Sequence, residues 1–211
     1  MANVTVYGPP QSTYVRTARI ALEEKGVAYE LGPVEFGQPS HLALHPFAKI
    51  PAFTHGDVHL YETIAITTYI NDAFKGAALL PADPAARARA FQWISVTNDY
   101  IYGIAIRDLV IERFVKPMRG GTPDEALIAR NKPTLLARFD IVDKALQGSS
   151  YLAGEYSLAD MFLLPIVAYL PALPEGREVL ARCRNIDAWL KRVMARPAVT
   201  KTAPPVPQAA E

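Results

Sequence analysis

The hydroxyl pair Ser12-Thr13 stands where a helical pattern begins, in the segment YGPPQSTYVRTARIALEEKG (residues 7–26). Serine is a favoured helix N-cap, because its side-chain oxygen accepts a hydrogen bond from a free backbone N–H of the first turn. The capping-box position three residues later holds Val15 rather than Glu or Gln. A hydroxyl here could equally donate to a bound thiolate. Lowering a thiol pKa by two units takes about 2.7 kcal/mol, which one charge-assisted hydrogen bond and a helix dipole can supply.

The dipeptide Ile50-Pro51, in HPFAKIPAF, comes just before a strand pattern. A proline entering a strand removes a backbone donor, so one interpretation is a simple strand-edge breaker. A cis bond at this place would instead turn the N–H and C=O of Ile50 outward. Those groups could then pair with a bound peptide as an added strand does.

The pair Glu62-Thr63 opens the helical segment ETIAITTYINDAF. Acidic and hydroxyl residues suit a helix N-terminus, both electrostatically and as caps. The same residues could bind the zwitterionic head of an amino acid. The free N–H groups and Thr63 would hold its carboxylate, and Glu62 would pair with its ammonium group.

The remaining reactive residues show no site pattern. His41, His45, His55 and His59 do not form a metal-binding motif on one helix, and His55 and His59 flank a hairpin, so we predict no metal site. Cys183 is the only cysteine and lies far from the motif residues, which favours a buried or idle thiol. Neither a phosphate loop nor a dinucleotide fingerprint is present.

The elements that carry these candidates follow the order β-α-β, a short helix, then β-β-α. Period-two stretches of β-branched and aromatic residues indicate the strands, and three- and four-residue apolar spacing indicates the helices. This order predicts a thioredoxin-like domain at residues 1–78 with a four-stranded mixed sheet. The expected elements are strands at 4–7, 29–34, 52–54 and 58–61, and helices at 13–25, 41–44 and 62–74.

The pattern changes after the first domain. Pro81 and Pro84 interrupt it, which places a linker at 79–85. An all-α domain is expected at 86–200, where strand signals fade. The proline-rich tail 201–211 is expected to be flexible. The helices predicted for this region cover 85–115, 124–146, 157–169 and 185–195.

Composition and charge narrow the class of protein. Half of the 211 residues are hydrophobic, and 22 Lys plus Arg balance 21 Asp plus Glu. This balance argues against a general nucleic-acid or anionic-membrane surface. The apolar runs are far shorter than the ~20 residues of a membrane span, and MANVTVYG lacks the features of a secretory signal. We therefore expect a cytoplasmic protein.

Four segments resemble the cytosolic glutathione transferases over nearly the whole chain: YGPPQSTYVRTARIALEEKGVAYE, HPFAKIPAF with LYETIAITTYI, YLAGEYSLADMFLLP and DAWLKRVMARPAV. By this resemblance the chain is a serine-type, bacterial-looking member, and Ser12 is the catalytic serine that stabilises the glutathione thiolate. The thiolate would attack a small apolar electrophile held between the two domains in a detoxification reaction. Glutathione is then the co-substrate, without a metal. The glutathione-binding residues that the resemblance implies are Lys49, Ile50, Pro51, Glu62 and Thr63.

The family also implies roles away from the glutathione site. An aromatic key that inserts into the partner of a homodimer falls on Phe47, for which an ordinary core or surface role is the alternative. The electrophile pocket would include Tyr102, Ile106 and Arg107. The SLAD segment, residues 157–160, matches the family's buried helix-capping box.

Several positions depart from the family pattern. Thr63 stands where the family usually has serine, and His45 where it usually has asparagine before the proline. The cysteine of the bacterial cysteine-type class would fall near Tyr14. Tyr7 resembles the tyrosine of other classes, but Ser12 matches better by its distance to IALEEKG. His41 could replace the missing basic ligands of the plant class, although an exposed loop histidine is the simpler interpretation.

Two other functions stay open. The chain could be a glutathione-fold binding or regulatory protein without transferase activity, because binding does not require Ser12. It could also be a glutathione-dependent peroxidase, dehalogenase or isomerase.

Overall fold

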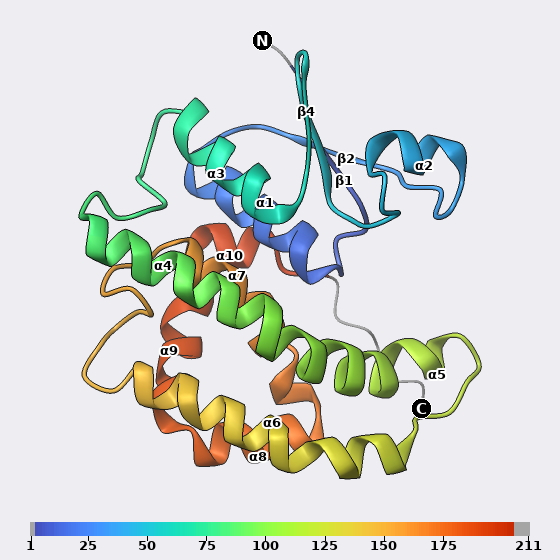
Figure 1. Ribbon diagram of the computed structural model, residues 1–211, viewed down its shortest axis with the longest axis vertical. Coiled ribbons are helices and arrows are strands. Elements are labelled where there is room, and N and C mark those ends of the chain that lie inside the picture. Colours follow the sequence, from blue (N-terminus) through green and yellow to red (C-terminus); the bar gives the residue numbers. More distant parts are fainter. Residues whose placement is uncertain (1–2, 205–211) are drawn as a thin grey trace. The chain divides into compact units, whose positions relative to one another are not determined.

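The computed structural model describes residues 3–204, which form two compact units. Unit 1 contains the chain up to Leu79 and again from Met194, and unit 2 contains Leu80–Val193. Unit 1 is a mixed sheet with helices, whereas the described elements of unit 2 are helices (Figure 1). The predicted thioredoxin-like domain followed by an all-helical domain is confirmed.

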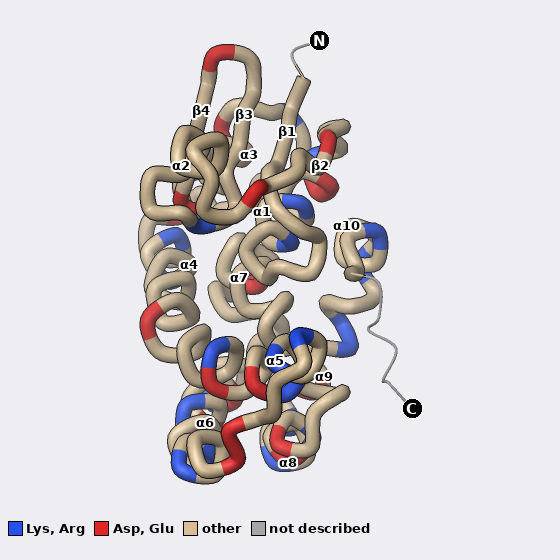
Figure 2. Tube along the Cα trace, turned by 90° about the vertical axis from the view of Figure 1, so that its right-hand side faces the viewer, with Lys and Arg blue, Asp and Glu red and all other residues tan. Residues whose placement is uncertain are grey.

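The sheet of unit 1 has the strand order β2-β1-β3-β4 (Figure 2). β1 runs parallel to β2 and antiparallel to β3, which is antiparallel to β4. One row across the sheet pairs Tyr7 with Ala52 and Ala52 with Tyr61. The elements before the linker are β1 (Val4–Tyr7), α1 (Thr13–Glu24), β2 (Glu30–Gly32), α2 (Pro39–Leu44), β3 (Ala52–His55), β4 (Val58–Tyr61) and α3 (Thr63–Ala73).

Helix α1 forms where the apolar spacing predicts it. Its apolar positions, among them Val15, Ala18 and Leu22, are fully buried, and the helix packs against α3. Gly26 follows the helix with a φ of 66°, a left-handed conformation that glycine adopts without steric cost. The amphipathic pattern and the glycine stop therefore fix the length of this helix.

The end of the described chain belongs to unit 1 rather than to the helical unit. Helix α10 (Pro197–Lys201) packs on α1 (Figure 2). The buried guanidinium of Arg16 donates to the carbonyl of Val199 at 3.3 Å, and that of Arg19 donates to the carbonyl of Thr202 at 3.2 Å. The expected all-α range of 86–200 includes this segment, which groups with unit 1 through the buried arginines of α1, and of the expected tail 201–211 the structure describes only residues 201–204. Residues 205–211 lie outside the described chain.

Unit 2 opens with a long helix whose register changes along its length. α4 (Pro84–Val96) continues into the π-helical segments η1 (Thr97–Ile101) and η2 (Gly103–Val115). The prediction of one helical stretch over 85–115 holds, but the π-type turns were not expected. The remaining elements are α5 (Lys116–Met118), α6 (Glu125–Ala145), α7 (Leu158–Val167), the 3-10 turn η3 (Leu170–Ala172), α8 (Pro174–Arg182) and α9 (Arg184–Met194).

Helix α7 forms the centre of unit 2, and all ten of its residues are buried. It begins with the predicted capping box, in which the carboxylate of Asp160 accepts the N–H of Ser157 at 3.1 Å. The same carboxylate accepts the indole N–H of Trp189 at 2.8 Å and the N–H of Leu152 at 3.2 Å. One buried carboxylate thus joins three segments of this unit.

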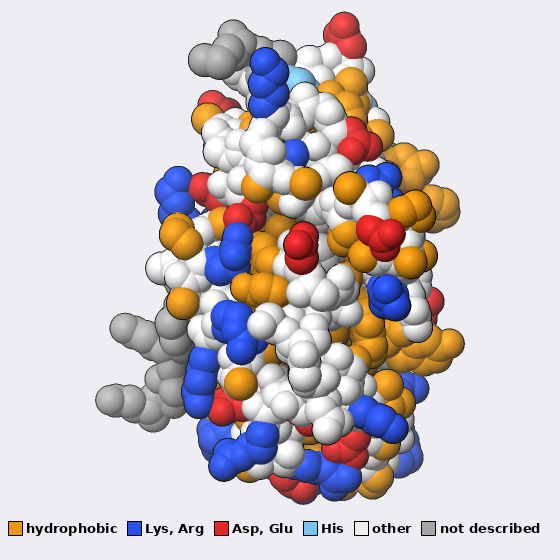
Figure 3. All heavy atoms as spheres, turned by 90° about the vertical axis from the view of Figure 1, so that its left-hand side faces the viewer, with side chains coloured by type: hydrophobic (Ala, Val, Ile, Leu, Met, Phe, Trp, Pro, Cys, Tyr) orange, Lys and Arg blue, Asp and Glu red, His pale blue; other side chains and the backbone are white. Residues whose placement is uncertain are grey.

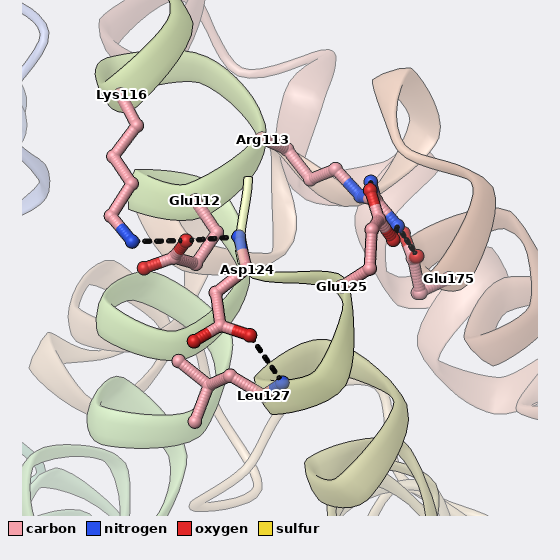
Figure 4. Close-up of polar contacts among 7 residues, drawn as sticks. All are labelled: Glu112, Arg113, Lys116, Asp124, Glu125, Leu127 and Glu175. Atoms are coloured by element: carbon pink, nitrogen blue, oxygen red, sulfur yellow. Dashed lines mark hydrogen bonds and ion pairs between the residues drawn. The ribbon is translucent and has the colours of Figure 1, made fainter. Parts of the chain in front are cut away.

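A polar network fixes the far end of η2 to α6 and α8 (Figure 4). Arg113 pairs with both Glu125 and Glu175. Buried Glu112 accepts the N–H of Asp124 at 2.8 Å and pairs with Lys116 at 2.6 Å. These contacts hold the segment between η2 and α6 in place.

The surface carries charges of both signs. Acidic and basic side chains interleave over the face drawn in Figure 3, in keeping with the balanced composition. In the described part of the chain, no single helix is long and apolar enough to cross a membrane, although the bent pair 158–172 and 174–182 together meets the length and composition criteria.

Candidate functional site

The register of the sheet brings the three predicted motifs to one edge. Beyond the row that joins Tyr7, Ala52 and Tyr61, the next residues are Gly8, Pro51 and Glu62. The segment from Gly8 leads within four residues to Ser12, and Glu62 leads directly into α3. Three chain segments that are distant in sequence therefore end at the same place.

Gly8 permits a close approach between two of these segments. A Cβ at this position would lie 2.6 Å from Cγ2 of Val15 and 3.3 Å from Cβ of Ile50. Its φ of 135° is also unfavourable for any residue with a side chain. Gly8 therefore lies close to both the first turn of α1 and the side chain of Ile50, which a larger residue would not allow.

Ser12 is the N-cap of α1. Its Oγ accepts a hydrogen bond from the N–H of Val15 at 3.4 Å, and its backbone is extended with φ −64° and ψ 130°. A serine hydroxyl has one donor hydrogen and two acceptor lone pairs. The cap uses one lone pair, and among the described residues the O–H donates to no partner, so it is available to a ligand. The two roles that the sequence left open for Ser12 are therefore compatible.

Tyr7 lies at the end of β1, as predicted. Its ring contacts the neighbouring strand β2, where a Cβ on Gly32 would lie 2.4 Å from the tyrosine Cδ1. The ring of Tyr7 therefore occupies the space above Gly32, and Ser12 is the hydroxyl at the helix N-terminus.

The Ile50–Pro51 peptide bond is cis. Pro51 is buried, and Ile50 is half-buried. Within residues 3–204, the backbone N–H and C=O of Ile50 make no hydrogen bond. Both groups are thus available to a peptide laid alongside them, which is the geometry of strand addition.

Glu62 has a strained backbone, with a φ of 67°. Non-glycine residues at positive φ are uncommon and cluster at ligand sites. Its side chain is 62% exposed and makes no capping hydrogen bond to α3, so the simple capping interpretation does not apply to it. The helix begins at buried Thr63 with its first N–H groups uncapped, which favours an anion at this position.

Lys49 is exposed, and its carbonyl accepts a hydrogen bond from Nε2 of His41 at 2.9 Å. His41 is only 1% exposed, and its Nδ1 accepts the N–H of Gly37 at 3.3 Å. Both interpretations of His41 from the sequence are therefore wrong. It is neither an exposed loop residue nor a glutathione ligand, because both ring nitrogens bind the backbone.

His45 is a second buried histidine that sequence analysis did not place in the site. It is 2% exposed, and burial lowers its pKa, although the carboxylate of Glu62 opposes this. Its Nε2 lies 4.0 Å from Oε1 of Glu62. The sequence feature that could have pointed to His45 is that histidine stands before Pro46, where the family usually has asparagine.

Phe47 is 69% exposed, which removes the core alternative. Its ring makes edge contacts with His45 and Tyr61, each at 6.3 Å between ring centroids.

The residues proposed for the electrophile lie in unit 2. Ile106 is 6% exposed, and the guanidinium of Arg107 lies 5.6 Å from the ring centre of Tyr102. Cys183 is buried at 1% exposure, and burial raises its pKa to about 12, which agrees with the predicted idle thiol. Among the described residues, no three His, Cys, Asp or Glu side chains gather closely enough to hold a metal ion.

The chain matches known proteins over nearly its whole length. The glutathione S-transferase N-terminal domain model matches residues 2–72, and the C-terminal domain model matches residues 58–197. Glutathione S-transferase 3 of Zea mays is 35% identical over 98% of this chain and 96% of its own length. Among solved structures, glutathione S-transferase III in apo form has a TM-score of 0.88 and 35% identity, over 98% of this chain and 100% of that one.

A further solved structure, glutathione S-transferase I from mais in complex with an atrazine glutathione conjugate, has a TM-score of 0.84 at 31% identity. It covers 95% of this chain and 96% of its own. The curated relatives include plant proteins from Zea mays and Hyoscyamus muticus, so the comparisons do not support the expected bacterial character. The chain belongs to the glutathione S-transferase family.

Proposed function

We propose that the protein joins the thiol of glutathione to a small apolar electrophile, as a serine-type glutathione transferase. The observation that carries this proposal is the Ser12 hydroxyl. It stands at the N-terminus of α1 and donates no hydrogen bond within residues 3–204, in the segment that starts at the same sheet edge as Pro51 and Glu62.

The residues at the sheet edge fit the parts of glutathione. The cysteinyl unit pairs with the N–H and C=O of Ile50, next to the cis-Pro51. The exposed carboxylate of Glu62 binds the α-ammonium group of the γ-glutamyl unit. The α-carboxylate of the same γ-glutamyl unit accepts hydrogen bonds from the free backbone N–H groups and the hydroxyl at Thr63. Lys49 is exposed and free to reach the glycyl carboxylate.

Ser12 acts on the ionisation of the thiol. A thiol with a pKa of ~8.5 is about 3% ionised at pH 7, whereas one at ~6.5 is about 76% ionised. The difference requires about 2.7 kcal/mol of preferential binding of the thiolate. A charge-assisted hydrogen bond supplies ~1.5–3 kcal/mol, and the positive end of α1 supplies ~0.3–1 kcal/mol.

The test is a titration of bound glutathione. Thiolate absorbance is followed against pH in the wild type, in Ser12→Ala and in Ser12→Gly. Glycine is nearly as good an N-cap as serine, so Ser12→Gly removes the hydroxyl with little loss of helix stability. We expect all three proteins to bind glutathione and only the wild type to lower its thiol pKa, with the rate at pH 7 falling about 25-fold in both variants.

Other results would assign another function. If the wild type binds glutathione with an unshifted thiol, the protein is a glutathione-binding or regulatory module and Ser12 is only a cap. If the thiol is activated, product analysis with peroxide, halogenated and isomerisable substrates separates transfer from peroxidase, dehalogenase and isomerase chemistry.

The proposal extends to the assembly and the second substrate. We propose that the protein forms a cytoplasmic homodimer, with exposed Phe47 inserting into the partner. Tyr102, Ile106 and Arg107 are proposed to contact the electrophile. The stacked Arg107 and Tyr102 offer an aromatic surface with a charged rim, which suits a flat apolar molecule.

A further inference from the structure

His45 lies at the centre of an aromatic cluster next to the glutathione site. Its ring is 4.9 Å from that of Tyr61 and 6.3 Å from that of Phe47, measured between centroids. The cluster follows α2 and includes the end of β4, just before Glu62. A buried imidazole therefore connects the exposed Phe47 turn with the start of α3.

The hydrogen bonds of His45 define its tautomer. Nδ1 accepts the N–H of Phe47 at 3.3 Å, so in the neutral ring the hydrogen is on Nε2. Nε2 is the atom that lies 4.0 Å from Oε1 of Glu62. The turn itself is closed by the N–H of Ala48, which donates to the carbonyl of His45 at 2.9 Å.

From this geometry we propose that His45 is the positioning residue for Glu62, and that protonation of His45 weakens glutathione binding. The inference rests on the proposed function, in which Glu62 binds the ammonium group of glutathione. The neutral ring packs beside the carboxylate, with Nε2 4.0 Å from Oε1 and no direct hydrogen bond, so it restricts the carboxylate by contact. A second positive charge there would compete with the ligand ammonium for the same carboxylate.

The groups that face the ring keep it neutral at pH 7. Burial contributes most to the lowered pKa of His45, and the charges on His41 and Lys49 act in the same direction. Glu62 opposes them. The Phe47 N–H also points at Nδ1 and would face a second hydrogen if the ring were protonated. Protonation is therefore expected only on the acid side of about pH 6.5.

The size of the effect follows from the separation of the charges. Glu62 is largely exposed, so its interaction with a charge 4.0 Å away is close to that in water. A ligand ammonium held by the same carboxylate would lie at a comparable distance from the ring, where the repulsion of two unit charges in water changes an equilibrium constant about fivefold. We expect the Kd to rise about fivefold as pH falls from 7.5 through the titration of His45.

The experiment measures binding of S-methylglutathione by calorimetry between pH 5 and 8. This ligand has no thiol, so thiol ionisation does not contribute to the pH dependence. The decisive variant is His45→Asn, whose amide oxygen can accept the Phe47 N–H in an Asx turn but cannot become charged. His45→Gln is a second uncharged replacement, for use if His45→Asn fails to fold. His59→Asn is the matched control, because His59 is an exposed histidine on β4.

We expect the wild type and His59→Asn to lose affinity about fivefold at acid pH and His45→Asn to bind with nearly constant affinity. In turnover assays the difference in pH dependence between the wild type and His45→Asn should appear in the KM for glutathione, because thiol ionisation changes kcat in both proteins alike. The inference is overturned if His45→Asn keeps the acid loss, if His59→Asn removes it, or if the wild type binds independently of pH. If the wild type binds neither glutathione nor S-methylglutathione at any pH, the proposed function itself fails.

Discussion

The buried carboxylate of Asp160 should make the free energy of unfolding depend on pH in an unusual direction. Its oxygens accept hydrogen bonds from Leu152, Ser157 and Trp189, yet the residue is fully buried. Burial raises the pKa of Asp160 to about 6, against an ordinary value of 3.8, and the three donors only partly offset this. Between about pH 4 and pH 6, Asp160 is therefore protonated in the native state but ionised in the unfolded chain.

The sign of the pH dependence follows from this difference. A raised native pKa contributes stability that is fully present below pH 3.8 and is lost as pH rises through about 6. The shift of about two units corresponds to about 3 kcal/mol in total. Between pH 5 and pH 7.5 the loss is about 1.4 kcal/mol, since part of it has already occurred below pH 5.

The perturbation is Asp160→Asn, which cannot titrate. Asparagine keeps one acceptor oxygen and turns an amide NH₂ toward one set of donors, at a cost of about 2 kcal/mol. Because the wild type loses stability as pH rises and the variant does not, the penalty of the substitution should shrink. We expect the destabilisation caused by Asp160→Asn to be about 1.4 kcal/mol smaller at pH 7.5 than at pH 5.

The assay is urea unfolding of both proteins at pH 5 and pH 7.5, at one fixed protein concentration because an oligomer would make the midpoint concentration-dependent. Comparing the two proteins cancels the titration of all other groups. Asp187→Asn, on α9, is the control. Asp187 pairs with Lys191 at 2.7 Å, so its penalty should not shrink with pH. An Asp160→Asn penalty that is constant, or larger at pH 7.5, would refute the reasoning and show that the three donors outweigh burial.

Three further predictions concern separate features. Phe47→Ser should convert the proposed homodimer to monomers in size-exclusion chromatography with light scattering, because it removes a ring that is 69% exposed; an unchanged dimer contradicts the key role. Cys183 should react with a thiol reagent more than a thousandfold more slowly in native than in unfolded protein at pH 8, because it is buried and its pKa is about 12; fast native labelling would show that the site opens. Gly32→Ala should lower the free energy of unfolding by about 1–3 kcal/mol, since its Cβ would meet the Tyr7 ring at 2.4 Å; the measurement is urea unfolding, with Gly103→Ala, which has open space at its Cβ and no left-handed backbone, as a comparison without a steric clash.

Local sequence patterns were sufficient for much of the fold. The spacing of Val15, Ala18 and Leu22 with Gly26 as a stop predicted α1, and the structure confirms it. The family resemblance of the SLAD segment predicted the capping box of α7, and the structure shows it. Both features depend on residues of one short segment, in which successive positions are at most four apart, so a single segment contains the information.

Other elements escaped prediction for a physical reason. α8 begins at Pro174 and is only nine residues long, so its apolar period was too short to distinguish from a loop. The return of α10 to unit 1 depends on Arg16 and Arg19, whose partners lie 183 residues away. A hydrogen bond to a distant carbonyl leaves no periodic signal.

The candidate site likewise has features that the sequence determines and features that only the folded chain determines. The sequence by itself determined which residue types are available: the Ser12 hydroxyl, the Ile50-Pro51 dipeptide and the Glu62-Thr63 pair. The tertiary structure decided how they are used. Strand register alone brings the ends of β1, β3 and β4 to one row, and only the folded backbone shows that Glu62 is strained and that His45 is buried beside it. Residue type is a local property, whereas proximity and burial arise only when segments far apart in the chain pack together.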